Sequence, residues 1–146
     1  MKVASADYNA NAVVFACLRD LADLYRKTGR PVEALRVDER LQTMAAPWVA
    51  AAATAQSARP FWRDAHRRAA ETLTALGRHH EAAARLEAAL KAAPEAERPA
   101  LHLYLARVRL AAGDPAAARA SADLAAKAAD LDDEAGRLRE EIARAP

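Results

Sequence analysis

The fold of this chain is decided by the stretch Leu21-Ala22-Asp23-Leu24-Tyr25-Arg26-Lys27-Thr28-Gly29-Arg30-Pro31-Val32-Glu33-Ala34-Leu35. Apolar residues recur every three or four positions on both sides of Gly29, which is the spacing of an amphipathic helix. Gly29 stands where a helix C-cap needs a left-handed residue, and Pro31 suits the first turn of the next helix. The stretch therefore predicts two helices joined by a tight turn.

The same turn occurs twice more, in Leu76-Gly77-Arg78-His79 and Ala112-Gly113-Asp114-Pro115. Superposing the three glycines aligns alanines seven residues before each one and five residues after each one. These alanines are Ala22, Ala70 and Ala106 before the glycines, and Ala34, Ala82 and Ala118 after them. Small residues at fixed places on both helices indicate closely packed helix pairs, because side-chain size sets the distance between helix axes.

The composition favours helices throughout. Alanine is the commonest residue, Leu, Arg and Glu supply much of the rest, and strand-forming residues are scarce. The favoured residues lose little conformational freedom in a helix. A chain of 146 residues is also long enough to bury one core. We therefore expect a single all-α domain over residues 1–146.

Glycine and proline mark the expected helix boundaries. Pro47 and Pro60 are interpreted as boundaries because proline deforms a helix interior, and the segment between them is read as an inserted alanine-rich helix. The predicted helices span residues 8–28, 31–45, 47–58, 60–76, 79–92, 97–112, 115–129 and 132–144.

Two of these helices have clear apolar faces. In the first, Leu18, Leu21, Leu24 and Tyr25 share one face, which we expect to be buried. The last has charged residues on its other faces, so it is expected to cap the fold with one buried stripe. That stripe is formed by Leu131, Ala135, Leu138 and Ile142.

The pattern resembles the tetratricopeptide repeat, a helix–turn–helix unit of 34 residues. The resemblance rests on Leu21-Ala22-x-x-Tyr25-x-x-x-Gly29-x-x-x-Glu33-Ala34, on Gly77-x-x-x-Glu81-Ala82 with Ala89 and Pro94, and on Gly113-Asp114-Pro115 with Ala118 and Ala125. It implies a tetratricopeptide-like α-solenoid of about three helix–turn–helix pairs, with an inserted helix and a C-terminal capping helix. The repeats are expected at about 15–46, 63–94 and 99–130, and the cap at 131–146.

Several residues depart from the repeat's pattern. Leu18, His66 and His102 stand where the repeat has tryptophan, and Asp38 replaces the aromatic residue of the second helix in the first pair. In the third pair, Arg109 replaces the tyrosine. A generic helical solenoid or an irregular bundle is therefore the alternative.

The resemblance implies a protein–protein interaction scaffold that binds a partner protein or peptide in a concave groove, lined by the first helix of each pair. Guanidinium groups suit carboxylates, so the arginines favour an acidic peptide, with a merely solvated face as the alternative for each residue. The candidate groove residues are Arg19, Asp23, Arg26, Arg67, Glu71 and Arg107.

A second candidate surface surrounds the insertion. Trp48 and Trp62, with Phe61, hold three of the seven aromatic residues of the chain. Aromatic clusters are either core or interface anchors. We expect these side chains to be buried, and exposure would instead indicate a contact with a partner or a second copy.

No catalytic, cofactor or metal-binding motif is evident. His79 and His80 are adjacent, so their side chains diverge by ~100° on a helix and cannot easily share a metal. Cys17 lies in an apolar run and is expected to be a buried structural thiol. We therefore expect no enzyme activity, no cofactor and no metal.

The alternatives for function are self-association as a structural or regulatory module, and nucleic-acid binding. The second rests on a pI near 8.9, but acidic and basic residues interleave and the formal net charge is only +2. No apolar run approaches the ~20 residues of a membrane span. A signal peptide is not indicated either, because polar residues interrupt the first apolar run. We expect a cytoplasmic protein.

Overall fold

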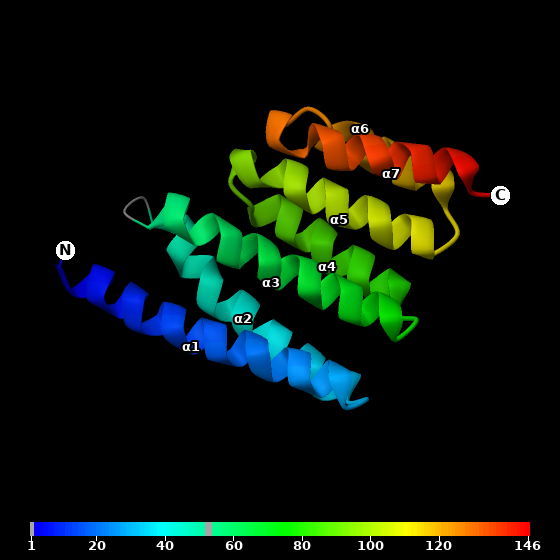
Figure 1. Ribbon diagram of the computed structural model, residues 1–146. Helices are drawn as coiled ribbons and strands as arrows, with labels where there is room; N and C mark the ends of the chain where they lie inside the picture. The colour runs from blue at the N-terminus through cyan, green and yellow to red at the C-terminus, as the bar shows by residue number, and fades with distance from the viewer. Residues whose placement is uncertain (1, 52–53) are drawn as a thin grey trace. The chain divides into compact units, whose positions relative to one another are not determined.

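The structure, a computed structural model, describes residues 2–51 and 54–146, with side chains from residue 9 onward. The described residues form α-helices and two short 3-10 helices and contain no strand, so the predicted all-α class is confirmed (Figure 1). The elements are α1 (Lys2–Lys27), α2 (Pro31–Ala50), α3 (Ala55–Ala75), α4 (His79–Ala92), η1 (Glu95–Glu97), α5 (Arg98–Ala111), α6 (Pro115–Ala125), η2 (Ala129–Leu131) and α7 (Asp132–Arg144).

The chain divides into two compact units. The first ends at Thr72 and holds α1, α2 and most of α3, while the second begins at Leu73 and holds the end of α3 with α4 to α7. A single domain over residues 1–146 remains a prediction.

The three glycine turns have the same backbone geometry. Gly29, Gly77 and Gly113 have φ values of 73°, 73° and 83°, the left-handed conformation that the sequence predicted. In each turn the glycine N–H donates to the carbonyl three residues earlier, and the next N–H donates to the carbonyl five residues earlier. The N···O distances are 3.2 and 2.8 Å at Gly29, 2.9 and 2.9 Å at Gly77, and 3.0 and 3.0 Å at Gly113. This is the Schellman arrangement, which satisfies carbonyls that a helix end leaves unpaired.

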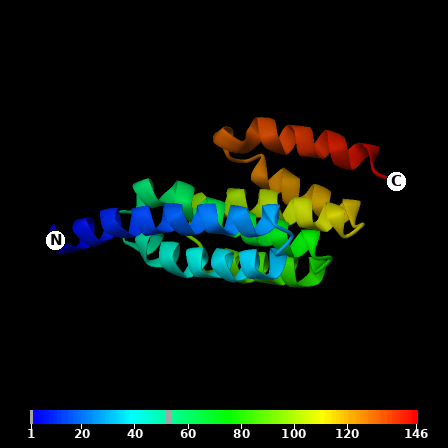
Figure 2. The same cartoon turned by 60° about the horizontal axis from the view of Figure 1, so that its bottom comes forward.

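In the first unit, α1 and α2 pack against each other as the two arms of a hairpin (Figure 2). The buried face of α2 has Leu41, Ala45 and Val49 at four-residue spacing. On α3, Ala58 and Trp62 begin a similar buried face. Apolar residues at this spacing share one side of a helix and are therefore buried together.

The predicted inserted helix over residues 47–58 is wrong. Pro47 lies inside α2 and Pro60 lies inside α3, so the segment is divided between these two helices. Each helix continues past its proline because the buried face runs through it, from Ala45 to Val49 in α2 and from Ala58 to Trp62 in α3. A proline inside a helix removes one hydrogen bond and its ring clashes with the preceding turn, at a cost of about 3 kcal/mol, which burial of these faces offsets.

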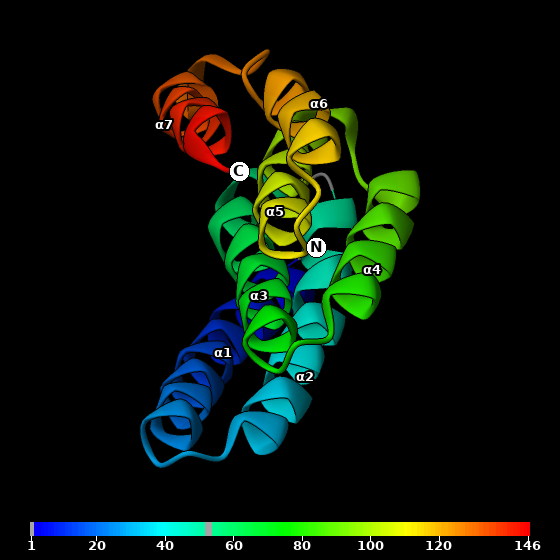
Figure 3. The same ribbon diagram turned by 90° about the vertical axis from the view of Figure 1, so that its right-hand side faces the viewer.

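In the second unit, α5 packs against α4, α6 and α7, as the view along the helices shows (Figure 3). Its residues Ala100, Leu103 and Ala106 are fully buried in a cluster with the inner faces of α6 and α7. The predicted stripe of α7 is confirmed, because Ala135, Leu138 and Ile142 belong to the same buried cluster, with Leu131.

The predicted burial of one face of α1 is only half right. Leu18 and Tyr25 are partly buried, but Leu21 and Leu24 are exposed. Cys17, expected to be a buried thiol, is exposed as well. The buried face of α1 instead carries Phe15 and Ala22, both of which are fully buried.

Candidate interaction surface

Five polar side chains from three helices meet inside the first unit. Arg26 of α1 pairs with Asp38 of α2, and Arg26 Nη2 donates to Thr72 Oγ1 of α3 at 2.7 Å. The Thr72 hydroxyl donates to Asp38 Oδ2 at 3.0 Å. Arg68 of α3 donates to Asp23 Oδ1 at 2.6 Å, and its Nε lies 3.5 Å from Asp38 Oδ1. We call these five residues the buried ion-pair cluster.

Charges in this cluster balance within the unit. Asp38 is fully buried, and burial raises the pKa of its carboxyl above its ordinary value, because Arg26, Thr72 and Arg68 only partly offset the loss of water. Burial also acts to raise the pKa of Asp23, but the hydrogen bond and charge of Arg68, with Arg26, hold that pKa below its ordinary value. The cluster therefore ties α1, α2 and α3 together.

This cluster engages two of the predicted groove residues, Asp23 and Arg26, in contacts between helices. Arg19 is more exposed than Arg26, with its Nε 3.7 Å from Asp20 Oδ1, and its carbonyl accepts a hydrogen bond from Arg68. Among the described residues, the Arg19 guanidinium thus has a long, exposed ion pair, whereas that of Arg26 is paired between helices.

Arg67 and Glu71 neutralise each other on α3. Arg67 Nη1 lies 2.9 Å from both carboxylate oxygens of Glu71, and its Nη2 lies 2.6 Å from Asp64 Oδ1. Burial acts to lower the pKa of Arg67, but these two carboxylates raise it above its ordinary value. The guanidinium fork is thus already occupied by carboxylates of its own helix.

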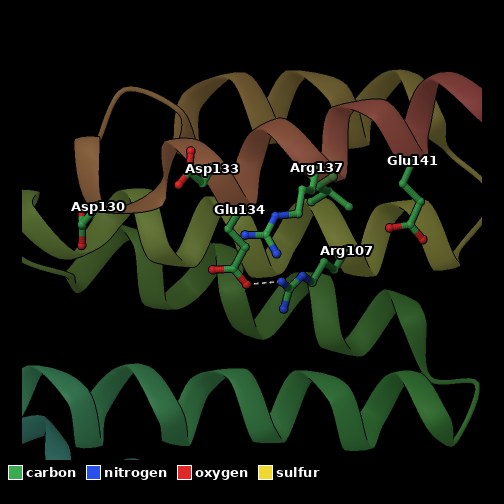
Figure 4. Close-up of a pocket in the computed structure, with 7 residues that line it drawn as sticks. Arg107, Asp130, Asp133, Glu134, Arg137 and Glu141 are labelled. Atoms are coloured by element: carbon green, nitrogen blue, oxygen red, sulfur yellow. Dashed lines mark hydrogen bonds and ion pairs between the residues drawn. The ribbon is translucent and has the colours of Figure 1, made fainter.

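Arg107 lies at a surface pocket of about 410 Å³ in the second unit. It pairs with Glu134 of α7, and Arg137 points toward the same space (Figure 4). The pocket is lined by Arg107, Asp130, Asp133, Glu134, Arg137, Leu138 and Glu141. Four carboxylates face two guanidiniums there, so the local charge does not suit the acidic peptide that the sequence predicted.

The aromatic residues form two groups in the first unit. Phe15, Trp48 and Phe61 come from α1, α2 and α3, with ring centroids 5.1 to 6.2 Å apart. Trp62 packs on His66 with ring centroids 4.4 Å apart. Trp62 is only 5% exposed, and Trp48 is partly buried. The expected burial is therefore confirmed for Trp62 and only in part for Trp48.

α1 has an exposed apolar face that the sequence did not lead us to expect. Val13 is 65% exposed, Val14 43%, Leu21 37% and Leu24 55%, and the exposed Cys17 lies between them. We call these five residues the α1 stripe. A helix turns ~100° per residue, so they lie on one side of α1, beside the face that carries Phe15 and Ala22.

A signal for this face was present in the sequence. Residues 14, 17, 21 and 24 repeat with alternating three- and four-residue spacing, and so do residues 15, 18, 22 and 25. Two adjacent apolar stripes make a helix apolar over more of its circumference than one packed face requires. The single buried face expected from the sequence combined Leu18 and Tyr25 of one stripe with Leu21 and Leu24 of the other.

His66 and His102 are partly buried histidines, one in each unit. Within the described residues, no three His, Cys, Asp or Glu side chains come together in a way that could hold a metal ion. Burial lowers the pKa of His66 to about 4 and, with the charges of nearby Arg109, Arg98 and Lys127, lowers the pKa of His102 as well. His66 Nδ1 lies 3.0 Å from Gln42 Nε2, which is a packing contact between α3 and α2.

Within residues 2–51 and 54–146, no helix combines the length and the apolar character needed to cross a lipid bilayer.

Comparison with protein-family models, with curated proteins and with solved structures finds no significant match. The function must therefore be argued from the surfaces of this chain alone.

Proposed function

We propose that this chain is a protein-interaction module, a helical scaffold of the tetratricopeptide type that binds a partner protein or peptide through the α1 stripe. The contact is apolar, and it replaces the arginine-lined groove that the sequence led us to expect.

The observation that carries the proposal is the exposure of neighbouring large apolar side chains on one helix. Four of the six exposed large apolar residues of the described chain lie on the α1 stripe. Single exposed apolar residues are normal on protein surfaces, but a contiguous apolar patch marks an interaction site more often than a solvated face.

The groove residues carry less of the proposal because their charges already have partners. Arg26 is paired within the buried ion-pair cluster, Arg67 is clamped by Asp64 and Glu71, and Arg107 is paired with Glu134. An acidic peptide would have to displace these carboxylates, and exchanging one ion pair for another gains little free energy. The acidic-peptide groove is therefore the less favoured form of the proposal.

Local features support the repeat scaffold. The three Schellman turns are alike, and the aligned residues Ala34, Ala82 and Ala118 are all fully buried. A stack of similar helix pairs requires a small buried residue at the same distance from the turn in each pair.

The test compares two variants in capture from a cell lysate. Leu21→Glu/Leu24→Glu places two charges on the stripe, whereas Leu124→Glu changes an apolar residue of α6 that is 39% exposed. Both variants should keep the helical circular dichroism of the wild type. The proposal expects partners that bind the wild type and the Leu124→Glu variant but are lost from the stripe variant. If every captured protein, a differently tagged copy of this chain included, binds all three forms equally, the stripe is not the binding surface.

A further inference from the structure

Four residues of the α1 stripe, Val14, Cys17, Leu21 and Leu24, belong to a longer regular seam. Adding Ala10 and Thr28, both exposed, gives positions 10, 14, 17, 21, 24 and 28, with spacings of four, three, four, three and four residues. This alternation averages 3.5 residues and is the pattern by which one helix packs against another in a left-handed coiled coil. The stripe therefore fits a helix that carries the same spacing.

α1 is itself such a helix. In heptad notation, Val14 and Leu21 occupy a positions, and Cys17 and Leu24 occupy d positions. A β-branched residue at a with leucine at d is the combination that favours two parallel strands. Val14 supplies the β-branched residue at a in the first heptad, and Leu24 supplies leucine at d in the second. Phe15 lies ~100° around the helix from Val14, so pairing along the stripe leaves its core contacts in place.

The charges beside the seam select the direction of pairing. Asp20 and Lys27 both lie on the g edge, whereas the e edge carries the uncharged Leu18 and Tyr25. In a parallel pair the g edge of one helix faces the e edge of the other, so Asp20 meets Tyr25 and no like charges meet. In an antiparallel pair whose seams overlap over their full length, the two g edges face each other and bring Asp20 beside its own copy near the middle of the seam, which is unfavourable.

We infer that a second copy of this chain occupies the α1 stripe, with the two α1 helices parallel about a twofold axis. The inference rests on the proposed function and names its partner. Because a twofold axis makes each surface face its own copy, Val14, Cys17, Leu21 and Leu24 each meet the same residue of the other chain.

The size of the seam sets the strength of the pair. Eighteen residue steps give a seam about 27 Å long, and a width of about 10 Å then gives roughly 300 Å² per partner. A standard stable interface buries ~800 Å² per partner. The dimer is therefore weak, and its population rises with concentration between the micromolar and the millimolar range.

Sedimentation velocity tests the pairing surface. The wild type should shift from the 15.7 kDa monomer toward the dimer as its concentration rises. Leu21→Glu/Leu24→Glu should raise the dissociation constant at least about tenfold, because it brings like charges together at the centre of the seam. The Leu124→Glu variant should follow the wild type. A wild type that stays monomeric, or a dimer that the stripe variant leaves unchanged, overturns the inference.

Disulfide trapping tests the direction. At a d position of a parallel pair, the two Cys17 thiols face each other, and diamide takes two electrons and two protons from them as the S–S bond forms. The control is Leu124→Cys in a Cys17→Ala background, which offers an exposed thiol outside the seam. Cys17 should cross-link several-fold faster than the control at equal concentration. Equal rates overturn the parallel arrangement.

The two proposals fail in different ways. A monomer at every concentration, combined with capture of other proteins that depends on the stripe, contradicts self-pairing and leaves the proposed function intact. A monomer whose captured proteins do not depend on the stripe contradicts both.

Discussion

Arg68 of α3 donates a 2.6 Å hydrogen bond to Oδ1 of Asp23 on α1, a residue 45 positions earlier in the sequence. The same guanidinium has its Nε 3.5 Å from Asp38 of α2, so one nearly buried side chain links three helices. Buried ionic groups stabilise the folded state only when each charge has a partner of opposite sign, because an unpaired buried charge raises the free energy of the folded state.

Asp38→Ala should lower the free energy of unfolding by about 3 to 5 kcal/mol. Asp23 and Asp38 both pair with Arg26 and Arg68, but only Asp38 is fully buried. The change removes this buried carboxylate and leaves the mostly buried Arg68 with the carboxylates of Asp23 and a distant Asp64. Urea unfolding followed by circular dichroism measures the loss.

The matched control is Glu134→Ala, which breaks the exposed pair with Arg107. It should cost less than about 1 kcal/mol, since solvent screens the interaction. Equal losses in the two variants would contradict a stabilising role for the buried ion-pair cluster.

Acidification should destabilise the first unit through His66. Its pKa falls from 6.5 to about 4 on folding because burial disfavours the charged ring. Between these two values the unfolded chain binds more protons than the folded chain, so the folded state loses stability as the pH falls through this window. The full loss is at most about 3 kcal/mol.

The free energy of unfolding, measured at intervals from pH 7 to pH 4, gives the slope of stability against pH. His66→Gln removes the titrating ring and should flatten the profile within this window. A variant with the same slope as the wild type would show that other groups cause the pH dependence.

Replacing the two helix-interior prolines with alanine should stabilise the protein. Pro47 and Pro60 are exposed, so Pro47→Ala and Pro60→Ala restore an N–H without losing packing. Each should add about 1 to 2 kcal/mol, which is the helix penalty of proline less its effect on the unfolded chain.

Pro31→Ala is the comparison, because Pro31 lies at the start of α2 where no N–H is needed. It should change the free energy of unfolding little, or lower it slightly. Thermal melts of the three variants measure these changes in stability. Destabilisation by Pro47→Ala and Pro60→Ala would show that the prolines stabilise the local structure.

In the second unit, Arg109→Met should cost about 1 to 3 kcal/mol of stability. Arg109 Nη1 donates to the buried Ser121 hydroxyl at 2.7 Å, and its Nη2 donates to Glu87 at 2.9 Å, so it connects α5 with α6 and α4. In a Ser121→Ala background the same substitution should cost less, because no buried hydroxyl then loses its donor. Equal costs in both backgrounds, measured by chemical unfolding, would mean that the Ser121 contact contributes nothing.

The sequence predicted those parts of the fold that depend on local chemistry. The glycine turns and the buried stripe of α7 follow from backbone conformation and from helical spacing, which a few neighbouring residues determine. The α2–α3 connection was missed because it has neither glycine nor proline. It is marked by Thr54, whose hydroxyl donates to the Trp48 carbonyl at 2.7 Å.

The candidate site was harder to predict because it depends on contacts between distant residues. Asp38 was noted only as a departure from the repeat's aromatic position, yet it lies at the centre of the buried ion-pair cluster. No spacing rule reveals that a charged residue on one helix finds its partners on two others. For the same reason, the sequence could not show which of the two apolar stripes of α1 the core covers.

The glycine turns have one more consequence, which concerns handedness. A Cβ built on Gly29, Gly77 or Gly113 meets no atom within 4 Å, so there is room for a side chain at all three positions. The penalty for L-alanine there comes only from its own stereochemistry at positive φ. Its mirror image, D-alanine, prefers that backbone region and has fewer conformations to lose on folding than glycine. A chemically synthesised chain with D-alanine at these three positions should therefore be more stable than the natural chain. L-alanine at the same positions should lower its stability.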